Sequence, residues 1–297
     1  MKVLFFGLGS IGKRYADLLK DKHELYAYRT SKKKNELMEK EVYKLEDAFK
    51  IKPDVVFITN PPHLHVTTAL ECAKRNIPMY IEKPISNSTL LIDKLDKTVK
   101  KNNVFTYVAY HLRFNTTLRG LKERKEIPFY FRVCCSSYLP DWRKKDYRNC
   151  YSSSRSFGGG VMLDLSHEFD YLNWLYGLKK IQGYQHKVSN LSVDCEDTFD
   201  GFVTCDKSSG SVHLDYFGRK EERSIELFFD DGYQFKLSFL MSKDVLHNVY
   251  KRQLKYFLNC LNNEETPMNN LSEAIYLFKK IMEVRNEGCI YNSRSRN

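Results

Sequence analysis

Lys83 is the residue of this chain whose setting most directly suggests bond chemistry. It stands in the triplet Glu-Lys-Pro, residues 82–84, directly after an apolar run at 79–81 that predicts a strand. An ammonium group at the carboxyl edge of a sheet can hydrogen-bond a substrate hydroxyl and stabilise a developing alkoxide. Pro84 can fix the turn, and a cis bond after Lys83 is one way to do so. Position alone also leaves open an ordinary surface lysine.

His167 is the second candidate, because it lies between Asp164 and Asp170 at spacings of three. We predict one helix over residues 161–176, on which these three side chains share a face. Histidine exchanges protons near neutral pH, and a neighbouring carboxylate can orient its ring. The alternative is a histidine held by purely structural partners.

Residues 7–12, Gly-Leu-Gly-Ser-Ile-Gly, supply the third piece of chemistry. They lie between a predicted strand at 2–6 and a predicted helix at 11–20, the setting in which this motif binds a dinucleotide. The helix N-terminus then offers free N–H groups to the phosphates. The residues also match part of a mononucleotide P-loop, but Arg14 stands where that motif needs a hydroxyl for magnesium. The expected contacts are Gly7, Gly9, Ser10, Ile11 and Gly12.

The end of the second predicted strand, 24–28, bears on the choice of cofactor. An NAD site usually has an acid about 20 residues past the glycines, whereas here Arg29, Thr30 and Ser31 are followed by two lysines. A guanidinium, two hydroxyls and two ammonium groups suit a 2′-phosphate. We predict that NADP(H) is preferred over NAD(H), with Arg29 as the main contact. The alternative is a solvated, lysine-rich turn.

Strands and helices alternate through the first part of the chain, which predicts a parallel, doubly wound sheet. Later runs separated by hairpin turns predict a mostly antiparallel sheet, followed by two helices. We place the boundary near residue 115, giving domains 1–115 and 116–297. The strands expected early are 2–6, 24–28, 54–59, 79–81 and 104–109, and the helices 11–20, 42–50, 66–74 and 90–100. The strands expected later are 129–137, 184–191, 198–205, 210–217, 223–230 and 233–240.

The composition excludes several classes of protein. The 297 residues carry a net charge of +11, and 42% are hydrophobic, which fits a folded chain. No apolar run is long enough for a membrane span or a secretory signal, so we expect a cytoplasmic protein. The eight cysteines lack zinc-site or disulfide spacing, and we predict no metal. No nucleic-acid reading motif accompanies the basic charge, which suits a surface rich in lysine or an anionic small molecule.

Taken in order, these motifs resemble the Gfo/Idh/MocA (glucose–fructose oxidoreductase / inositol dehydrogenase) family over nearly the whole chain. The residues that carry the resemblance are Gly7–Gly12, the Thr-Asn-Pro-Pro turn at 59–62 with His65, the triplet 82–84, Arg113-Phe114-Asn115, and the three glycines 158–160 followed by Asp164, His167 and Asp170.

The resemblance implies an N-terminal Rossmann domain, a C-terminal α/β domain with an open sheet that often mediates oligomerisation, and hydride transfer between nicotinamide and a sugar-type alcohol or ketone. It makes Lys83 the expected catalytic lysine and His167 the expected acid/base, and we count Asp164 with them as a catalytic residue. It also implies that Asn60, Pro61, His65, Glu82 and His111 border the cofactor or substrate. One departure concerns Asp164, which precedes His167 by three residues where many members have four.

An aromatic, basic loop at 138–148 resembles a loop of bacterial members associated with surface-sugar biosynthesis. Trp142 can stack on a sugar face, and Arg143 and Arg148 can hold a carboxylate or phosphate. The alternative is an ordinary packed loop. We count His111, Arg113, Trp142, Arg143, Arg148, Asp164 and His167 as expected substrate contacts.

Together these observations predict an NAD(P)-dependent oxidoreductase of a sugar, sugar acid or nucleotide sugar, working as a homodimer or homotetramer without nucleic-acid or membrane partners. Two alternatives stay open. One is a reductase of a non-sugar substrate, such as a dihydrodiol or a bilin. The other is a nucleotide-binding regulator that does not turn over.

Overall fold

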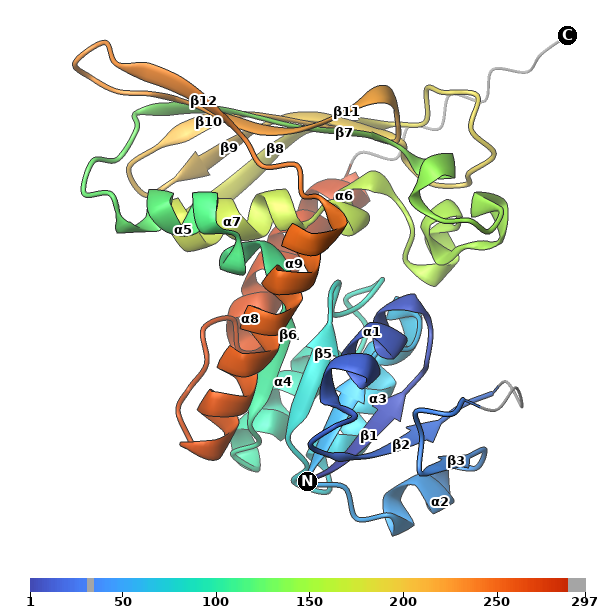
Figure 1. Cartoon of the computed structure of the whole chain (residues 1–297). Coiled ribbons are helices and arrows are strands. Elements are labelled where there is room, and N and C mark those ends of the chain that lie inside the picture. The colour runs from blue at the N-terminus through green and yellow to red at the C-terminus, as the bar shows by residue number, and fades with distance from the viewer. Residues whose placement is uncertain (31–34, 288–297) are drawn as a thin grey trace, which may run out of the picture. The chain divides into compact units, whose positions relative to one another are not determined.

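A computed structural model describes residues 1–30 and 35–287, and these form two compact units (Figure 1). The first comprises Met1–Tyr110 and Tyr250–Ile275; the second comprises His111–Val249 and the C-terminal segment from Tyr276. A division of the sequence into two parts at residue 115 does not anticipate the return of Tyr250–Ile275 to the first unit. No helix in the described part of the chain is long and apolar enough to cross a membrane.

The first unit is built on a six-stranded sheet in the order β3-β2-β1-β4-β5-β6, with every neighbouring pair parallel. This is the doubly wound order, and the predicted Rossmann fold is confirmed. The central strands are apolar because helices cover both faces. The strands are β1 Lys2–Phe6, β2 Glu24–Tyr28, β3 Lys40–Val42, β4 Val55–Ile58, β5 Met79–Glu82 and β6 Thr106–Ala109.

The helix expected over 42–50 is only partly correct. The chain first forms β3, and the helix α2 is confined to Leu45–Lys50. β3 escapes prediction because its three residues, Lys-Glu-Val, are mostly polar and are held by pairing with β2 alone. The other helices of this unit are α1 Ser10–Leu19, α3 His65–Ala73 and α4 Ile92–Lys101, with a short 3₁₀ helix η1 at Pro62–Leu64.

The second unit is built on a six-stranded sheet in the order β12-β11-β7-β10-β9-β8. All neighbours are antiparallel except β7 and β10, which run parallel, so the expected mostly antiparallel sheet is confirmed. The strand expected at 184–191 begins earlier, directly after Gly177. The strands are β7 Tyr130–Tyr138, β8 Leu178–His186, β9 Thr198–Cys205, β10 Ser209–Asp215, β11 Phe217–Phe228 and β12 Gln234–Ser238.

The prediction of a single helix over 161–176 is wrong. The structure has two, α6 Val161–Asp164 and α7 His167–Tyr176, with Leu165 and Ser166 between them. Asp164 and His167 therefore do not share one regular helical face, as the spacing argument requires. The other helices are η2 His111–Phe114, α5 Thr116–Glu123, α8 Lys243–Asn262 and α9 Leu271–Glu287; the loop after β7 holds η3 Leu139–Trp142, η4 Tyr147–Asn149, η5 Tyr151–Ser153 and η6 Arg155–Phe157.

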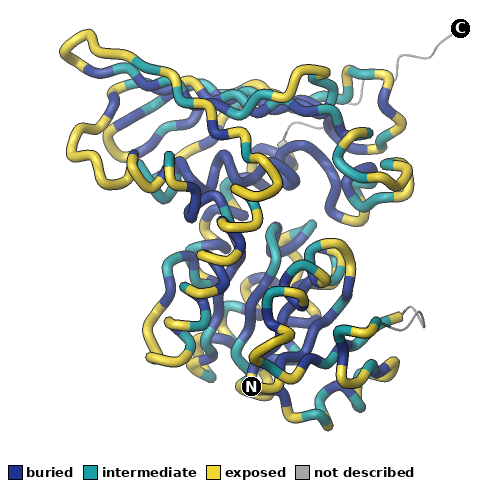
Figure 2. The backbone as a smooth tube through the Cα atoms, in the orientation of Figure 1, coloured by how far each residue is buried: buried dark blue, intermediate teal, exposed yellow. Residues whose placement is uncertain are grey.

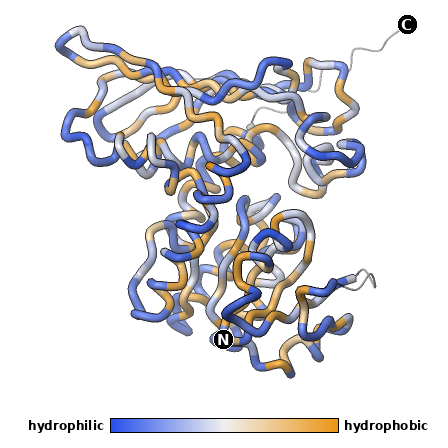
Figure 3. Tube along the Cα trace, in the orientation of Figure 1, coloured by the Kyte–Doolittle hydropathy of each residue, from blue (hydrophilic) through white to orange (hydrophobic). Residues whose placement is uncertain are grey.

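Each unit has its own core, made of its strands and the helix faces turned toward them. Buried residues follow the strands of both sheets, while exposed ones gather in loops (Figure 2). In Figure 3 hydrophobic residues follow the same strands and hydrophilic ones mark many of the connections. In the first unit the ring of Phe257 on α8 lies edge-on to those of Phe57 and Tyr80, at 5.6 and 4.9 Å, which packs the returning segment against the sheet.

Candidate active site

The glycine turn has the geometry of a dinucleotide-binding turn. Gly7 has φ +94°, and a Cβ there would stand 2.8 Å from the backbone of Asn60. At Gly12 a Cβ would stand 2.6 Å from the Gly7 carbonyl oxygen. Around Gly9, by contrast, nothing lies within 4 Å of where a Cβ would be. Two glycines therefore close the turn, and the third leaves its surface open for a ligand to approach.

Helix α1 begins at this open position. Its N-cap is Gly9, and no side chain caps it. The N–H groups of the first helical turn, beginning with Ser10 and Ile11, are therefore donors that lack carbonyl partners within the helix. Such a helix start can hold the phosphates of a dinucleotide.

His65 connects the two turns that follow β4 and β5. Its Nδ1 lies 2.8 Å from the Pro84 carbonyl oxygen, and its Nε2 lies 2.7 Å from that of Asn60. Burial lowers the pKa of His65 to about 4, so the ring is neutral at pH 7 and its single N–H donates to one of these two carbonyls. His65 thus fixes the Asn60-Pro61 turn against the turn that carries Lys83, and the Lys83–Pro84 bond is cis.

Glu82 is held by Tyr15, a residue of the helix that follows the glycine turn. The Tyr15 hydroxyl on α1 donates to Glu82 Oε1 at 2.8 Å and accepts from the Tyr80 hydroxyl at 2.6 Å. Burial raises the pKa of the Glu82 carboxyl to about 7. Through Tyr15, the helix of the glycine turn is linked to the residue beside Lys83. Nothing in the sequence marks this tyrosine, because its position also suits an ordinary apolar helix face.

Beside the end of β2 lies a second residue that the sequence did not reveal, Glu41 of β3. Arg29 Nη1 lies 2.9 Å from Glu41 Oε1, and their side chains are only 11% and 6% exposed. The guanidinium expected to meet a 2′-phosphate therefore already has a carboxylate partner. Thr30 directly follows, while Ser31 lies outside the described residues. Glu41 could not be recognised because it stands on β3, the strand that was not predicted.

In the second unit, His111 and His167 lie against one another. Their rings are 4.2 Å apart, centre to centre, at an angle of 70°. His111 begins η2, and His167 begins α7. His167 is 3% exposed. The structure thus brings together the expected acid/base and one of the expected substrate contacts.

Arg113 has a different setting from the one expected. It is buried and forms two hydrogen bonds with Asp170, Nε to Oδ2 at 2.9 Å and Nη2 to Oδ1 at 2.7 Å. This bidentate salt bridge fixes η2 to α7, and thereby His111 to His167. The arrangement supports a positioning role for Arg113 instead of direct contact with substrate.

Asp164 also contacts side chains of its own unit. Its Oδ2 accepts from the Tyr216 hydroxyl at 2.7 Å, and the Trp142 ring lies edge-on to Tyr216 at 5.3 Å. Burial first, and then the Asp164 carboxylate, raise the pKa of Tyr216 well above its usual value, so the phenol stays protonated. Asp164 and Trp142 are thus brought together through Tyr216, a residue with no signal in the sequence.

The two arginines of the loop after β7 differ in their surroundings. Arg143 is partly buried, with Nη1 3.3 Å from Ser152 Oγ and its guanidinium over the Tyr151 ring. Arg148 is 62% exposed and forms a salt bridge with Asp146 of its own loop at 2.6 Å. Trp142 also donates to Ser137 Oγ at 3.1 Å. Trp142 packs against Tyr216, which contacts Asp164, and the charge of Arg143 also interacts with Asp164. Arg148 lies on the surface.

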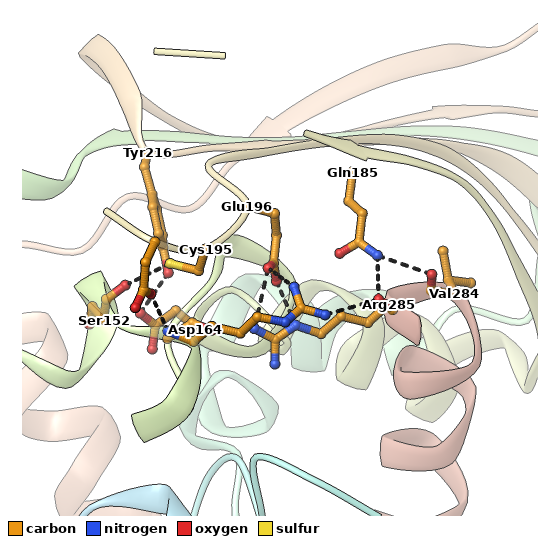
Figure 4. A network of polar contacts seen from close by, with 11 residues as sticks. Ser152, Asp164, Gln185, Cys195, Glu196, Tyr216, Val284 and Arg285 are labelled. Atoms are coloured by element: carbon orange, nitrogen blue, oxygen red, sulfur yellow. Dashed lines mark hydrogen bonds and ion pairs between the residues drawn. The ribbon is translucent and has the colours of Figure 1, made fainter. Parts of the chain in front are cut away.

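The glycines before α6 are held by a buried ion pair. Arg285 Nε donates to Glu196 Oε1 at 2.8 Å, and Arg285 Nη2 also donates to the Gly159 carbonyl oxygen (Figure 4). At Gly160, which has φ +114°, a Cβ would run into the Glu196 carboxylate. This contact sets the start of α6 and so the path of the chain toward His167. This contact could not be predicted, because Glu196 and Arg285 are 89 residues apart.

Comparisons with known proteins agree with this architecture. Residues 1–110 match the model of the oxidoreductase family with an NAD-binding Rossmann fold, GFO_IDH_MocA. The myo-inositol 2-dehydrogenase of Thermotoga maritima is 26% identical over 193 residues, which cover 60% of this chain and 55% of that protein. The chain thus spans little more than half the length of that relative. The predicted resemblance to the Gfo/Idh/MocA family is confirmed by these matches.

Solved structures share the fold of the whole chain. Myo-inositol 2-dehydrogenase from Lactobacillus plantarum superposes with a TM-score of 0.83 at 15% identity, covering 98% of this chain and 97% of that one. The WlbA dehydrogenase from Bordetella pertussis, solved with NADH and UDP-GlcNAcA, gives 0.81 at 18% identity, with coverage of 97% and 96%. At such identities the likeness establishes the fold alone.

Proposed function

We propose that this chain, which has the NAD-binding Rossmann fold of the Gfo/Idh/MocA family, is an oxidoreductase that transfers a hydride between a nicotinamide dinucleotide and a sugar-type CH–OH group. The observation that carries the proposal is the linkage of three turns in the first unit. The open glycine turn, the Asn60 turn and the Lys83 turn are joined through Tyr15 and His65. A dinucleotide held by the first turn would thus have its surroundings fixed by the other two.

The first unit would hold the dinucleotide. The N–H groups at the start of α1 would hold the phosphates, and the space beside Gly9 would admit them. The Asn60-Pro61 turn and Glu82 border the bound molecule, with His65 as the residue that keeps them in place. When bound, the nicotinamide ring supplies the redox chemistry by accepting or returning the hydride.

The chain's own residues would handle the proton. In the oxidative direction Lys83 holds and polarises the substrate oxygen, and His167 accepts the hydroxyl proton. His111 contacts His167 and would bind a neighbouring substrate hydroxyl. Asp164 binds the Tyr216 hydroxyl, and the Tyr216 ring packs against Trp142. Arg113 binds Asp170. Both Asp164 and Arg113 are therefore positioning residues in this scheme.

The substrate class is a polyol, sugar acid or nucleotide sugar. Two similar proteins are named for myo-inositol, and another was solved with a UDP-linked sugar acid. Trp142 offers an apolar ring to a sugar face, and Arg143 offers a positive charge to a carboxylate or phosphate. The second sheet is proposed to mediate a homo-oligomer. The Arg29-Thr30 sequence supports NADP(H), whereas the carboxylate beside Arg29 supports NAD(H).

The test is a screen of the purified chain with both oxidised and both reduced cofactors against polyols, sugar acids and UDP-sugars. On the substrate that turns over, Lys83→Ala is expected to lower kcat by about 100-fold or more, because it removes the charge beside the reacting oxygen. The Kd for the dinucleotide should stay within about threefold.

Lys74→Ala is the matched control, because Lys74 is an exposed lysine at the end of α3. Its kcat should equal that of the unmodified chain. Full activity of Lys83→Ala, or failure of every substrate in the screen, would refute the proposed reaction.

A further inference from the structure

The Arg29–Glu41 pair lies at the edge of the first sheet where the glycine turn begins. The Gly7 N–H donates to the Tyr28 carbonyl oxygen at 3.2 Å, so the end of β2 lies beside that turn. One residue later, the Arg29 N–H donates to the Val42 carbonyl oxygen at 3.0 Å. This bond continues the pairing of β2 with β3 and sets Glu41 next to Arg29. In a dinucleotide fold this is the place of the adenosine ribose.

Both oxygens of Glu41 are held. Oε1 accepts from Arg29 Nη1 at 2.9 Å and from the Asn35 N–H at 2.7 Å, and Oε2 accepts from the Tyr43 hydroxyl at 3.1 Å. The side chains of Glu41 and Arg29 are mostly shielded from water. Charges in such a setting interact more strongly than surface pairs do. The carboxylate is therefore a fixed feature of this edge.

The pair changes what the edge can bind. A 2′-phosphate brings two negative charges toward a guanidinium that Glu41 already neutralises, and toward Glu41 itself. A ribose 2′-hydroxyl can instead donate to a carboxylate, which is the usual basis of NAD recognition. The acid that is absent from the end of β2 is thus present one strand away.

We propose that Glu41 determines which dinucleotide this chain binds, by pairing with Arg29 and disfavouring a 2′-phosphate relative to a 2′-hydroxyl. The proposal rests on the proposed function only in requiring a dinucleotide site at the glycine turn. It reverses the preference for NADP(H) expected from Arg29, Thr30 and Ser31 alone, because it adds a charge that the local sequence does not contain.

The test measures the Kd values of NADH and NADPH by cofactor fluorescence, without turnover. Glu41→Gln keeps the size of the side chain and removes its charge, so Arg29 loses this carboxylate partner. The ratio Kd(NADPH)/Kd(NADH) is expected to fall by about tenfold or more. Arg29→Met alone leaves the Glu41 carboxylate without its cation and should not tighten NADPH binding, whereas added to Glu41→Gln it should abolish the gain.

Glu39→Gln is the matched control, since Glu39 is exposed and two residues away on the same segment. It should leave the ratio unchanged. The assignment is overturned if the ratio falls less than about threefold in Glu41→Gln, or if Glu39→Gln has the same effect. It is also overturned if the unmodified chain binds NADPH more tightly than NADH, a result that does not depend on the folding of any variant. Binding of neither dinucleotide would refute the proposed function as well.

Discussion

The two units hold their candidate residues by different means. In the first, the residues stand on turns at the carboxyl ends of neighbouring parallel strands, so the sheet places the turns side by side, and Tyr15 and His65 then link them. In the second, His167, Asp164 and their neighbours are held by side chains from distant parts of the chain. Asp170 is bound by Arg113, and Asp164 by Tyr216. The first kind of site follows from topology, and the second depends on individual buried contacts.

The largest expected effect tests this dependence in the second unit. Asp170→Ala removes the carboxylate that pairs with Arg113, where the side chains are 0% and 1% exposed. Losing one partner of a buried ion pair costs about 3–5 kcal/mol, because a charge stays buried without its counter-ion. Both tryptophans, Trp142 and Trp174, lie in this unit, so tryptophan fluorescence during urea unfolding reports on it directly.

The matched control is Glu226→Ala. Glu226 pairs with Arg132 on the same sheet, but their side chains are 28% and 59% exposed. Its loss should cost less than about 1 kcal/mol. Equal losses for the two variants would show that burial of the pair does not matter and would remove the contrast between the units.

A prediction of intermediate size concerns the first unit, where the buried His65 and the partly buried Glu82 flank the Lys83 turn with opposite pH behaviour. Burial raises the Glu82 pKa from 4.5 to about 7, so the folded state binds more protons and loses stability as pH rises through that interval. Burial lowers the His65 pKa from 6.5 to about 4, so stability rises with pH between those values. Between pH 5 and 6.5 the two contributions oppose one another.

Single variants should expose each contribution. As the pH rises from 5 to 6.5, the free energy of unfolding of Glu82→Gln should increase by up to about 2 kcal/mol relative to that of the unmodified chain. Over the same interval that of His65→Gln should decrease by up to about 2 kcal/mol relative to the unmodified chain. The measurement is amide hydrogen exchange of β1 and β4 at the two pH values. If both variants keep the pH slope of the unmodified chain, neither group titrates as its burial implies.

The same contrast explains what the sequence could predict. The glycine turn, the strand ends and Lys83 were recognisable because a few adjacent residues specify each of them. β3 was missed because it is short and polar and exists only by pairing with β2. The break between α6 and α7 was missed because Leu165 and Ser166 are compatible with a helix. Glu41, Tyr216 and Arg285 were missed because their partners lie 12, 52 and 89 residues away.

The smallest expected effect isolates one of these distant contacts. Tyr216→Phe keeps the ring against Trp142 and removes only the hydroxyl that donates to Asp164. Because a buried acceptor loses a donor, the free energy of unfolding should fall by about 1–3 kcal/mol. Urea unfolding followed by tryptophan fluorescence measures this loss. Tyr184→Phe, on a side chain that is 75% exposed, should change it by less than about 0.5 kcal/mol. If Tyr216→Phe proved equally neutral, this hydroxyl would not be what holds Asp164, and the contrast with the turns of the first unit would fail at this position.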